Sequence, residues 1–246
     1  MDEKIHKGLV ISDFNISNFV GYLNNDEESP TVCAEEAPYG QVWQTLMKES
    51  IVECIDGSDN CFAIIWTLPQ GLIPSFPRVL EYQSVEIEKL YEEVDDFCEV
   101  LKNAVTGIEF AFLMSWTLPS YHRGFGLLDM KNGTGMSNIL SRLNLRVADN
   151  LNGSQNIYLL NTSRWVELSG SSAYNPKFWY MGKIAFSNDV FKRAVADIKA
   201  GIRGIQGQSR KLILLDLDNT LWGGIVGDDG WKNLQLGGHD PVGESS

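Results

Sequence analysis

The sequence is poor in histidine and cysteine, and this scarcity excludes several kinds of site. Its 246 residues include 3 histidines and 4 cysteines. The cysteines Cys33, Cys54, Cys61 and Cys98 form no C-x-x-C pair, so neither a zinc site nor a disulfide framework is indicated. We interpret them as reduced, buried thiols of a cytoplasmic protein.

Long apolar runs and basic residues are also scarce. No run reaches the roughly 18 apolar residues that a membrane helix needs. The first run, residues 9–11, is too short for the core of a signal peptide. Lys and Arg total 20 against 32 Asp and Glu, which gives a formal net charge of -12. Because nucleic acids and anionic membranes repel such a chain, we expect neither as a partner.

The sequence does contain short apolar runs that alternate with amphipathic segments. Strands are expected at residues 9–12, 31–35, 61–68, 108–116, 156–160 and 211–216. Longer helices are expected at 85–105, 135–150 and 189–205. This alternation predicts an α/β fold with a mainly parallel sheet between two helical layers. In such sheets, the working residues lie in loops at the carboxyl ends of the strands.

The most informative segment is LILLDLDNTLWGG, which begins at Leu212. An apolar strand delivers Asp216 and Asp218 at its carboxyl end, two residues apart and therefore on one side. Two carboxylates this close repel each other unless a cation such as Mg²⁺ lies between them. Asp216 is then the candidate nucleophile and Asp218 the candidate acid and base, both as metal ligands. Thr220 is placed to hold the turn or to contact a phosphate oxygen. The alternative is a plain buried strand that ends in a capped turn.

The same segment resembles a known family. DLDNTLW matches the D-x-D-x-T signature of phosphotransferases of the haloacid dehalogenase (HAD) type. The run from Lys211 to Glu244 resembles the FkbH-like branch, as do NPKFWYMGKIAFSNDVFKRAVADI and APYGQ further upstream. The resemblance implies an SGNH-like domain over residues 1–205, followed over 210–246 by the first strand and flap of a HAD Rossmann-like domain.

The resemblance also implies a function. FkbH-like proteins transfer glyceryl-type units from a phosphorylated three-carbon donor to an acyl carrier protein, in polyketide or surface-polysaccharide pathways. A HAD site further needs a later Ser or Thr, a Lys or Arg, and more acidic ligands, which residues up to Ser246 do not supply. We therefore expect a truncated HAD portion with weak or absent Mg²⁺ binding, and association through its unpaired strand.

Residues 1–205 offer a second set of candidates. Ser12 follows the first strand, Gly40 lies after the second, and the loop from Trp66 to Pro69 follows the third. We expect these three to converge in a substrate-binding site. Arg123, in the segment SYHRGFG, is a further candidate for binding the substrate.

The resemblance to the SGNH-like fold implies an asparagine after the third strand and a late aspartate–histidine pair as catalytic partners of the serine. In this sequence the third loop has no asparagine, and no histidine occurs between His122 and His239. We therefore expect no histidine within hydrogen-bond reach of Ser12. Two alternatives remain beside the transferase: a non-catalytic ligand-binding or scaffolding module, and an esterase that uses Ser12.

Overall fold

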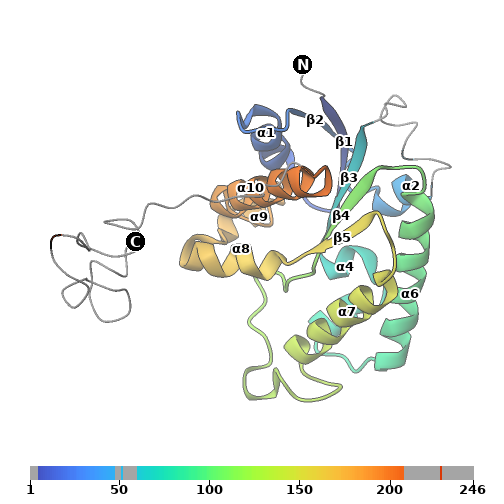
Figure 1. Ribbon diagram of the computed structural model, residues 1–246. Coiled ribbons are helices and arrows are strands. Elements are labelled where there is room, and N and C mark those ends of the chain that lie inside the picture. The colour runs from blue at the N-terminus through green and yellow to red at the C-terminus, as the bar shows by residue number, and fades with distance from the viewer. Residues whose placement is uncertain (1–4, 48–50, 52–59, 208–227, 229–246) are drawn as a thin grey trace. The chain divides into compact units, whose positions relative to one another are not determined.

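A computed structural model describes residues 5–47, 51, 60–207 and 228 of the chain. The chain divides into two units, Met1–Arg203 and Gly204–Ser246. The strand expected at 211–216, with Asp216, Asp218 and Thr220, lies outside the described residues. All strands of the described residues belong to the first unit (Figure 1).

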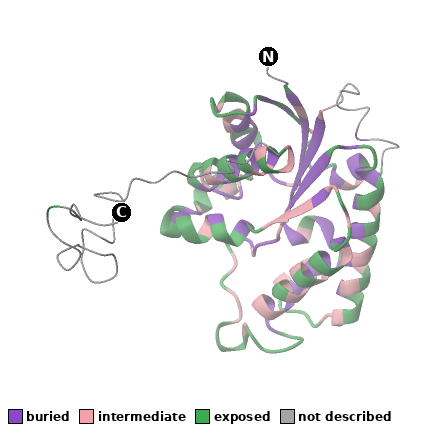
Figure 2. Ribbon diagram, viewed as in Figure 1, coloured by how far each residue is buried: buried purple, intermediate pink, exposed green. Residues whose placement is uncertain are grey.

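The first unit is built on five parallel strands in the order β2-β1-β3-β4-β5. The strands are β1 (His6–Ser12), β2 (Val32–Glu36), β3 (Cys61–Trp66), β4 (Phe110–Met114) and β5 (Ile157–Leu160). Every residue of β3 and β4 is buried, as expected for central strands covered on both faces (Figure 2). This confirms the predicted α/β fold with a parallel sheet.

Helices cover both faces of the sheet. Those of the described residues are α1 (Ser17–Asn25), α2 (Val42–Leu46), α4 (Pro69–Leu72), α5 (Phe76–Leu80), α6 (Ile87–Ala104), α7 (Met136–Leu151), α8 (Thr162–Ser169), α9 (Pro176–Gly182) and α10 (Asn188–Ile205). In Figure 1, α2, α4, α6 and α7 lie on one side of the sheet and α1, α8, α9 and α10 on the other. Two single turns of 3₁₀ helix, Gly126–Leu128 and Gly170–Ser172, complete the set.

The two faces of β3 pack against different helices. Ala63 and Ile65 belong to a hydrophobic core that also contains residues of α6 and α7. The alternate residue Trp66 contacts aromatic rings of α1 and α10, among them Phe19 and Phe191. Because successive strand residues point to opposite faces, one apolar run serves both layers. The strand expected at 61–68 ends at Trp66, since Pro69 begins α4.

One expectation about exposure needs correction: the thiols of Cys61 and Cys98 are buried as predicted, but Cys33 is exposed. On α6, Asp95 accepts hydrogen bonds from Arg146 at 2.6 and 2.7 Å. That ion pair joins α6 to α7, and the Arg146 guanidinium lowers the pKa of the Asp95 carboxyl. None of the described helices is long and apolar enough to cross a membrane.

A buried lysine holds α10 against the loop between α1 and β2. Lys199 is 1% exposed. Its Nζ donates to the backbone oxygens of Asp26 and Glu28, at 2.7 and 2.5 Å, and to Asp26 Oδ1 at 2.9 Å. A buried ammonium is tolerated only when its protons are used in this way. The three bonds join segments that are more than 170 residues apart in sequence.

We predict that Lys199→Met lowers the free energy of unfolding by about 3 kcal/mol, because methionine leaves three acceptors without their charged donor. Lys192→Met is the control on the same helix. Lys192 is exposed and contacts only the face of the Tyr22 ring among the interactions described, so its loss costs at most about 1 kcal/mol. Urea unfolding followed by circular dichroism measures both. Equal effects of the two substitutions would contradict the structural role of Lys199.

Candidate functional site

The carboxyl ends of the strands meet at one edge of the sheet. Strand register places Ser12 of β1 beside Trp66 of β3. It also pairs Met114 of β4 with Leu160 of β5. The loops after these residues therefore leave the sheet on the same side, where parallel sheets bind their ligands.

The predicted N-terminal site residues differ in burial and in position. Ser12 is buried, and its Oγ accepts a hydrogen bond from the Phe14 amide at 3.2 Å. Gly40 lies in the turn after β2, with a positive φ of 71° that favours glycine. Arg123 is exposed and lies in the loop after β4, a different loop from the one that follows Ser12. The register thus brings Ser12 to the start of the Trp66–Pro69 loop.

The two histidines among the described residues are engaged elsewhere. His122 Nε2 lies 2.9 Å from the Leu80 carbonyl oxygen, and its Nδ1 accepts from the Gly124 amide at 2.9 Å. His6 begins β1 and Ser12 ends it, so the two are separated by roughly 20 Å of extended strand. The described residues therefore provide Ser12 with no histidine base.

Asp13 is a residue of this edge that was not among the candidates selected from the sequence. Its Oδ1 accepts a hydrogen bond from the Leu68 amide at 2.9 Å, which ties the loop after β1 to the loop after β3. Its Oδ2 lies against Gly71, where an added Cβ would approach it to 1.9 Å. Burial raises the pKa of the Asp13 carboxyl to about 7, against the opposing effect of the amide bonds. An acidic residue directly after a buried strand was the available signal.

Aromatic side chains close the edge beside Asp13. The Phe14 ring meets both Trp66 and Phe186 edge-on, with centroids 6.1 and 5.6 Å apart. The Asn15 amide donates to the Lys183 carbonyl oxygen at 2.9 Å. The turn after β1 is therefore fixed to the segment after α9, and the Phe14, Trp66 and Phe186 side chains are buried there.

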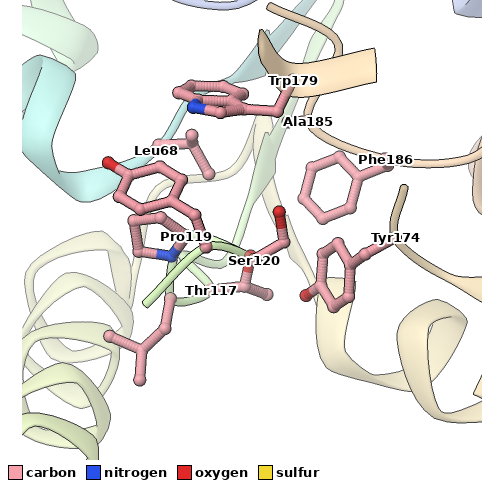
Figure 3. Close-up of a pocket in the computed structure, with 10 residues that line it drawn as sticks. Leu68, Thr117, Pro119, Ser120, Tyr174, Trp179, Ala185 and Phe186 are labelled. Atoms are coloured by element: carbon pink, nitrogen blue, oxygen red, sulfur yellow. The ribbon is translucent and has the colours of Figure 1, made fainter. Parts of the chain in front are cut away.

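The loop after β4 lies between two hollows that share five lining residues. The shared residues are Thr117, Leu118, Pro119, Ser120 and Tyr174. The first hollow is too narrow for a water molecule, and Leu68, Trp179, Ala185 and Phe186 help to close it (Figure 3). The second is open, about 360 Å³ in volume, and is lined in addition by His122, Leu140, Ser163 and Val166.

The described residues contain no group of three or more His, Cys, Asp or Glu side chains that could hold a metal ion. The predicted Mg²⁺ ligands Asp216 and Asp218 lie outside them.

Comparison with solved structures supports the fold. The chain is similar to the N-terminal part of the protein BF1531 from Bacteroides fragilis, described as containing a phosphatase domain and complexed with Mg. The TM-score is 0.79 at 23% sequence identity, over 98% of this chain and 63% of that one. This chain therefore spans less than two thirds of the length of that structure. At this identity the likeness establishes a shared fold.

A second likeness is weaker. It is to the C-terminal catalytic domain of peptidoglycan O-acetyltransferase A from Streptococcus pneumoniae, with a TM-score of 0.43 and 12% identity. It covers 82% of this chain and 94% of that domain, and nothing is inferred from it. No protein-family model matches the chain, and no curated protein matches it significantly.

The raised pKa of Asp13 predicts a dependence of stability on pH. Between the ordinary pKa of 3.8 and about 7, the folded protein holds a proton on Asp13 that the unfolded chain has lost. Stability from this group is therefore greatest below pH 4 and falls as pH rises to 7, by at most about 1.4 kcal/mol per pH unit.

Asp13→Asn keeps an oxygen for the Leu68 amide but cannot ionise. We expect it to remove this slope between pH 5 and 7, in urea unfolding at several pH values. Asp95→Asn is the control. Since the pKa of Asp95 is lowered, its contribution is lost only below about pH 4, so the slope between pH 5 and 7 persists. An unchanged slope in Asp13→Asn would show that Asp13 is ionised in the folded protein.

Proposed function

We propose that this chain is the N-terminal portion of an FkbH-like, Mg²⁺-dependent phosphoryl- and acyl-transfer protein. In this proposal Asp216 and Asp218 carry the chemistry, and the α/β unit binds a ligand without cleaving it. The D-x-D-x-T signature supports the first part. The fold shared with a structure described as containing a phosphatase domain is consistent with it.

The observation that supports the second part is that neither histidine of the described residues lies within reach of Ser12. A serine hydroxyl is a weak nucleophile unless a neighbouring group takes its proton. Ser12 Oγ is buried and accepts the Phe14 amide, while His122 is held by Leu80 and Gly124. A site at the carboxyl edge of a parallel sheet that lacks a histidine base is suited to binding a ligand.

The chemistry proposed for the HAD portion depends on its two carboxylates. Their hard oxygens suit Mg²⁺, which would neutralise charge on the phosphoryl group when bound. A carboxylate oxygen of Asp216 forms a bond to phosphorus as the bond to the leaving oxygen breaks. Asp218 gives its proton to that oxygen. Asp218 then takes a proton from the water that releases phosphate from Asp216.

The proposed donor is a phosphorylated three-carbon compound, and the proposed acceptor of its glyceryl-type unit is an acyl carrier protein. The exposed carboxylates of α6, among them Glu88, Glu92 and Glu99, bear on where such a carrier docks. Carrier proteins are typically acidic, so repulsion disfavours α6 as the docking surface. We propose that a carrier uses another face.

Hydrolysis of p-nitrophenyl acetate tests the role of Ser12. We expect no turnover above the spontaneous rate, and no difference between the wild type and Ser12→Ala, because neither histidine of the described residues reaches Ser12. Turnover that Ser12→Ala abolishes would establish an esterase in place of a binding module.

Hydrolysis of p-nitrophenyl phosphate tests the nucleophile. We expect Mg²⁺-dependent phosphate release to fall at least about 10³-fold in Asp216→Asn and to persist in Ser12→Ala. Removal of Mg²⁺ with EDTA is expected to have the same effect as Asp216→Asn. Equal activity of Asp216→Asn and wild type would reject Asp216 as the nucleophile.

A further inference from the structure

We propose that the open hollow beside the loop after β4 binds a small uncharged ligand, one that carries an amide or hydroxyl group on a short aliphatic body. The hollow has a volume of about 360 Å³, which is within the range of small-molecule sites. It lies at the carboxyl edge of the sheet, between the loop after β4 and the first residues of α8. The inference deepens the proposed function, because it specifies what the α/β unit would bind and where.

The first observation is a hydroxyl that lines the hollow and has no hydrogen bond. Thr117 is 7% exposed, and its Oγ1 is fully buried without a hydrogen-bond partner in the described part of the chain. A buried hydroxyl without a partner is costly, and native proteins rarely keep one without a reason. A ligand atom in the adjoining hollow would supply the missing bond.

The second observation is the Tyr174 phenol on the same wall. Burial raises the pKa of Tyr174, and the neighbouring Thr117 hydroxyl opposes that rise, although the two groups do not meet hydrogen-bond geometry. Figure 3 shows the Tyr174 hydroxyl on the side of its ring that is nearer Thr117. Hydroxyls that are close but not bonded to each other can both bond one polar group of a ligand, as donors or acceptors.

The third observation is the lack of charge around the hollow. No Asp, Glu, Lys or Arg is among the nine residues that line it. Both ring nitrogens of His122 are already engaged, one with the Leu80 carbonyl and one with the Gly124 amide. A phosphate or carboxylate would therefore find no counter-charge among these nine residues. The side chains of Leu118, Leu140 and Val166 instead offer apolar contact.

A shape-matched pair of probes tests the proposal. Hexanamide and hexanoate have the same carbon chain, but only hexanoate is charged. Ligand-observed NMR titration of the protein measures the Kd of each. We expect hexanamide to bind and hexanoate to bind at least about tenfold more weakly, because the site has no cation to pair with a carboxylate.

Three variants localise the binding. Thr117→Val and Tyr174→Phe each keep the shape of the side chain and remove its hydroxyl, so each is expected to raise the Kd of hexanamide at least about fivefold. Thr162→Val is the matched control. Thr162 also has a fully buried hydroxyl without a hydrogen-bond partner in the described part of the chain, but it does not line the hollow. The Kd of hexanamide should therefore be unchanged in Thr162→Val.

Three results would overturn the proposal. The first is no hexanamide binding up to about 50 mM, the range expected for so small a compound. The second is hexanoate binding as tightly as hexanamide. The third is an unchanged Kd in both Thr117→Val and Tyr174→Phe, with circular dichroism showing both variants folded. None of these readouts involves turnover, so their failure leaves the tests of Ser12 and Asp216 unaffected.

Discussion

Parallel pairing of β1 with both of its neighbours is the constraint on which the rest of this unit depends. Since β2, β1 and β3 run the same way, each connection must cross a face of the sheet, and helices come to cover both faces. The same pairing brings the loops after all strands to one edge. Polar residues that are scattered through the sequence, such as Asp13 and Thr117, therefore belong to one region of the molecule.

Buried polar groups in this unit differ in how fully they are satisfied, and that difference separates structural from functional roles. Lys199 uses its charge in three hydrogen bonds and joins α10 to the loop before β2. Asp13 has an amide partner, but burial still raises its pKa to about 7, so its charge is costly at neutral pH. The Thr117 hydroxyl lies near the Tyr174 phenol but meets hydrogen-bond geometry with no group of the described residues, and Thr117 adjoins an open hollow.

The sequence and the structure draw attention to different residues of the site. In the sequence, Ser12 stands out because it follows a strand, although the histidine and asparagine usual for an SGNH-like site are missing. In the structure, His122 is held by Leu80 and Gly124, and His6 lies at the other end of β1 from Ser12. The structure also shifts attention from Ser12 to the adjacent Asp13 and to the loop after β4. Neither Thr117 nor Tyr174 stands out in the sequence, because an isolated hydroxyl residue has no distinguishing pattern.

The sequence by itself determined the class of fold, the approximate strands and the long helices. Local periodicity carries that information, as in the buried run at β3 and the amphipathic patterns of α6, α7 and α10. The short helices α4, α5, α8 and α9 were not predicted, because a single turn or two has too little periodicity to recognise.

Only the tertiary structure decided which polar groups are satisfied. The partners of Lys199 lie more than 170 residues away, and the amide partner of Asp13 lies 55 residues away. The cost of a buried charge or hydroxyl depends on such distant partners, which burial selects and sequence spacing does not reveal.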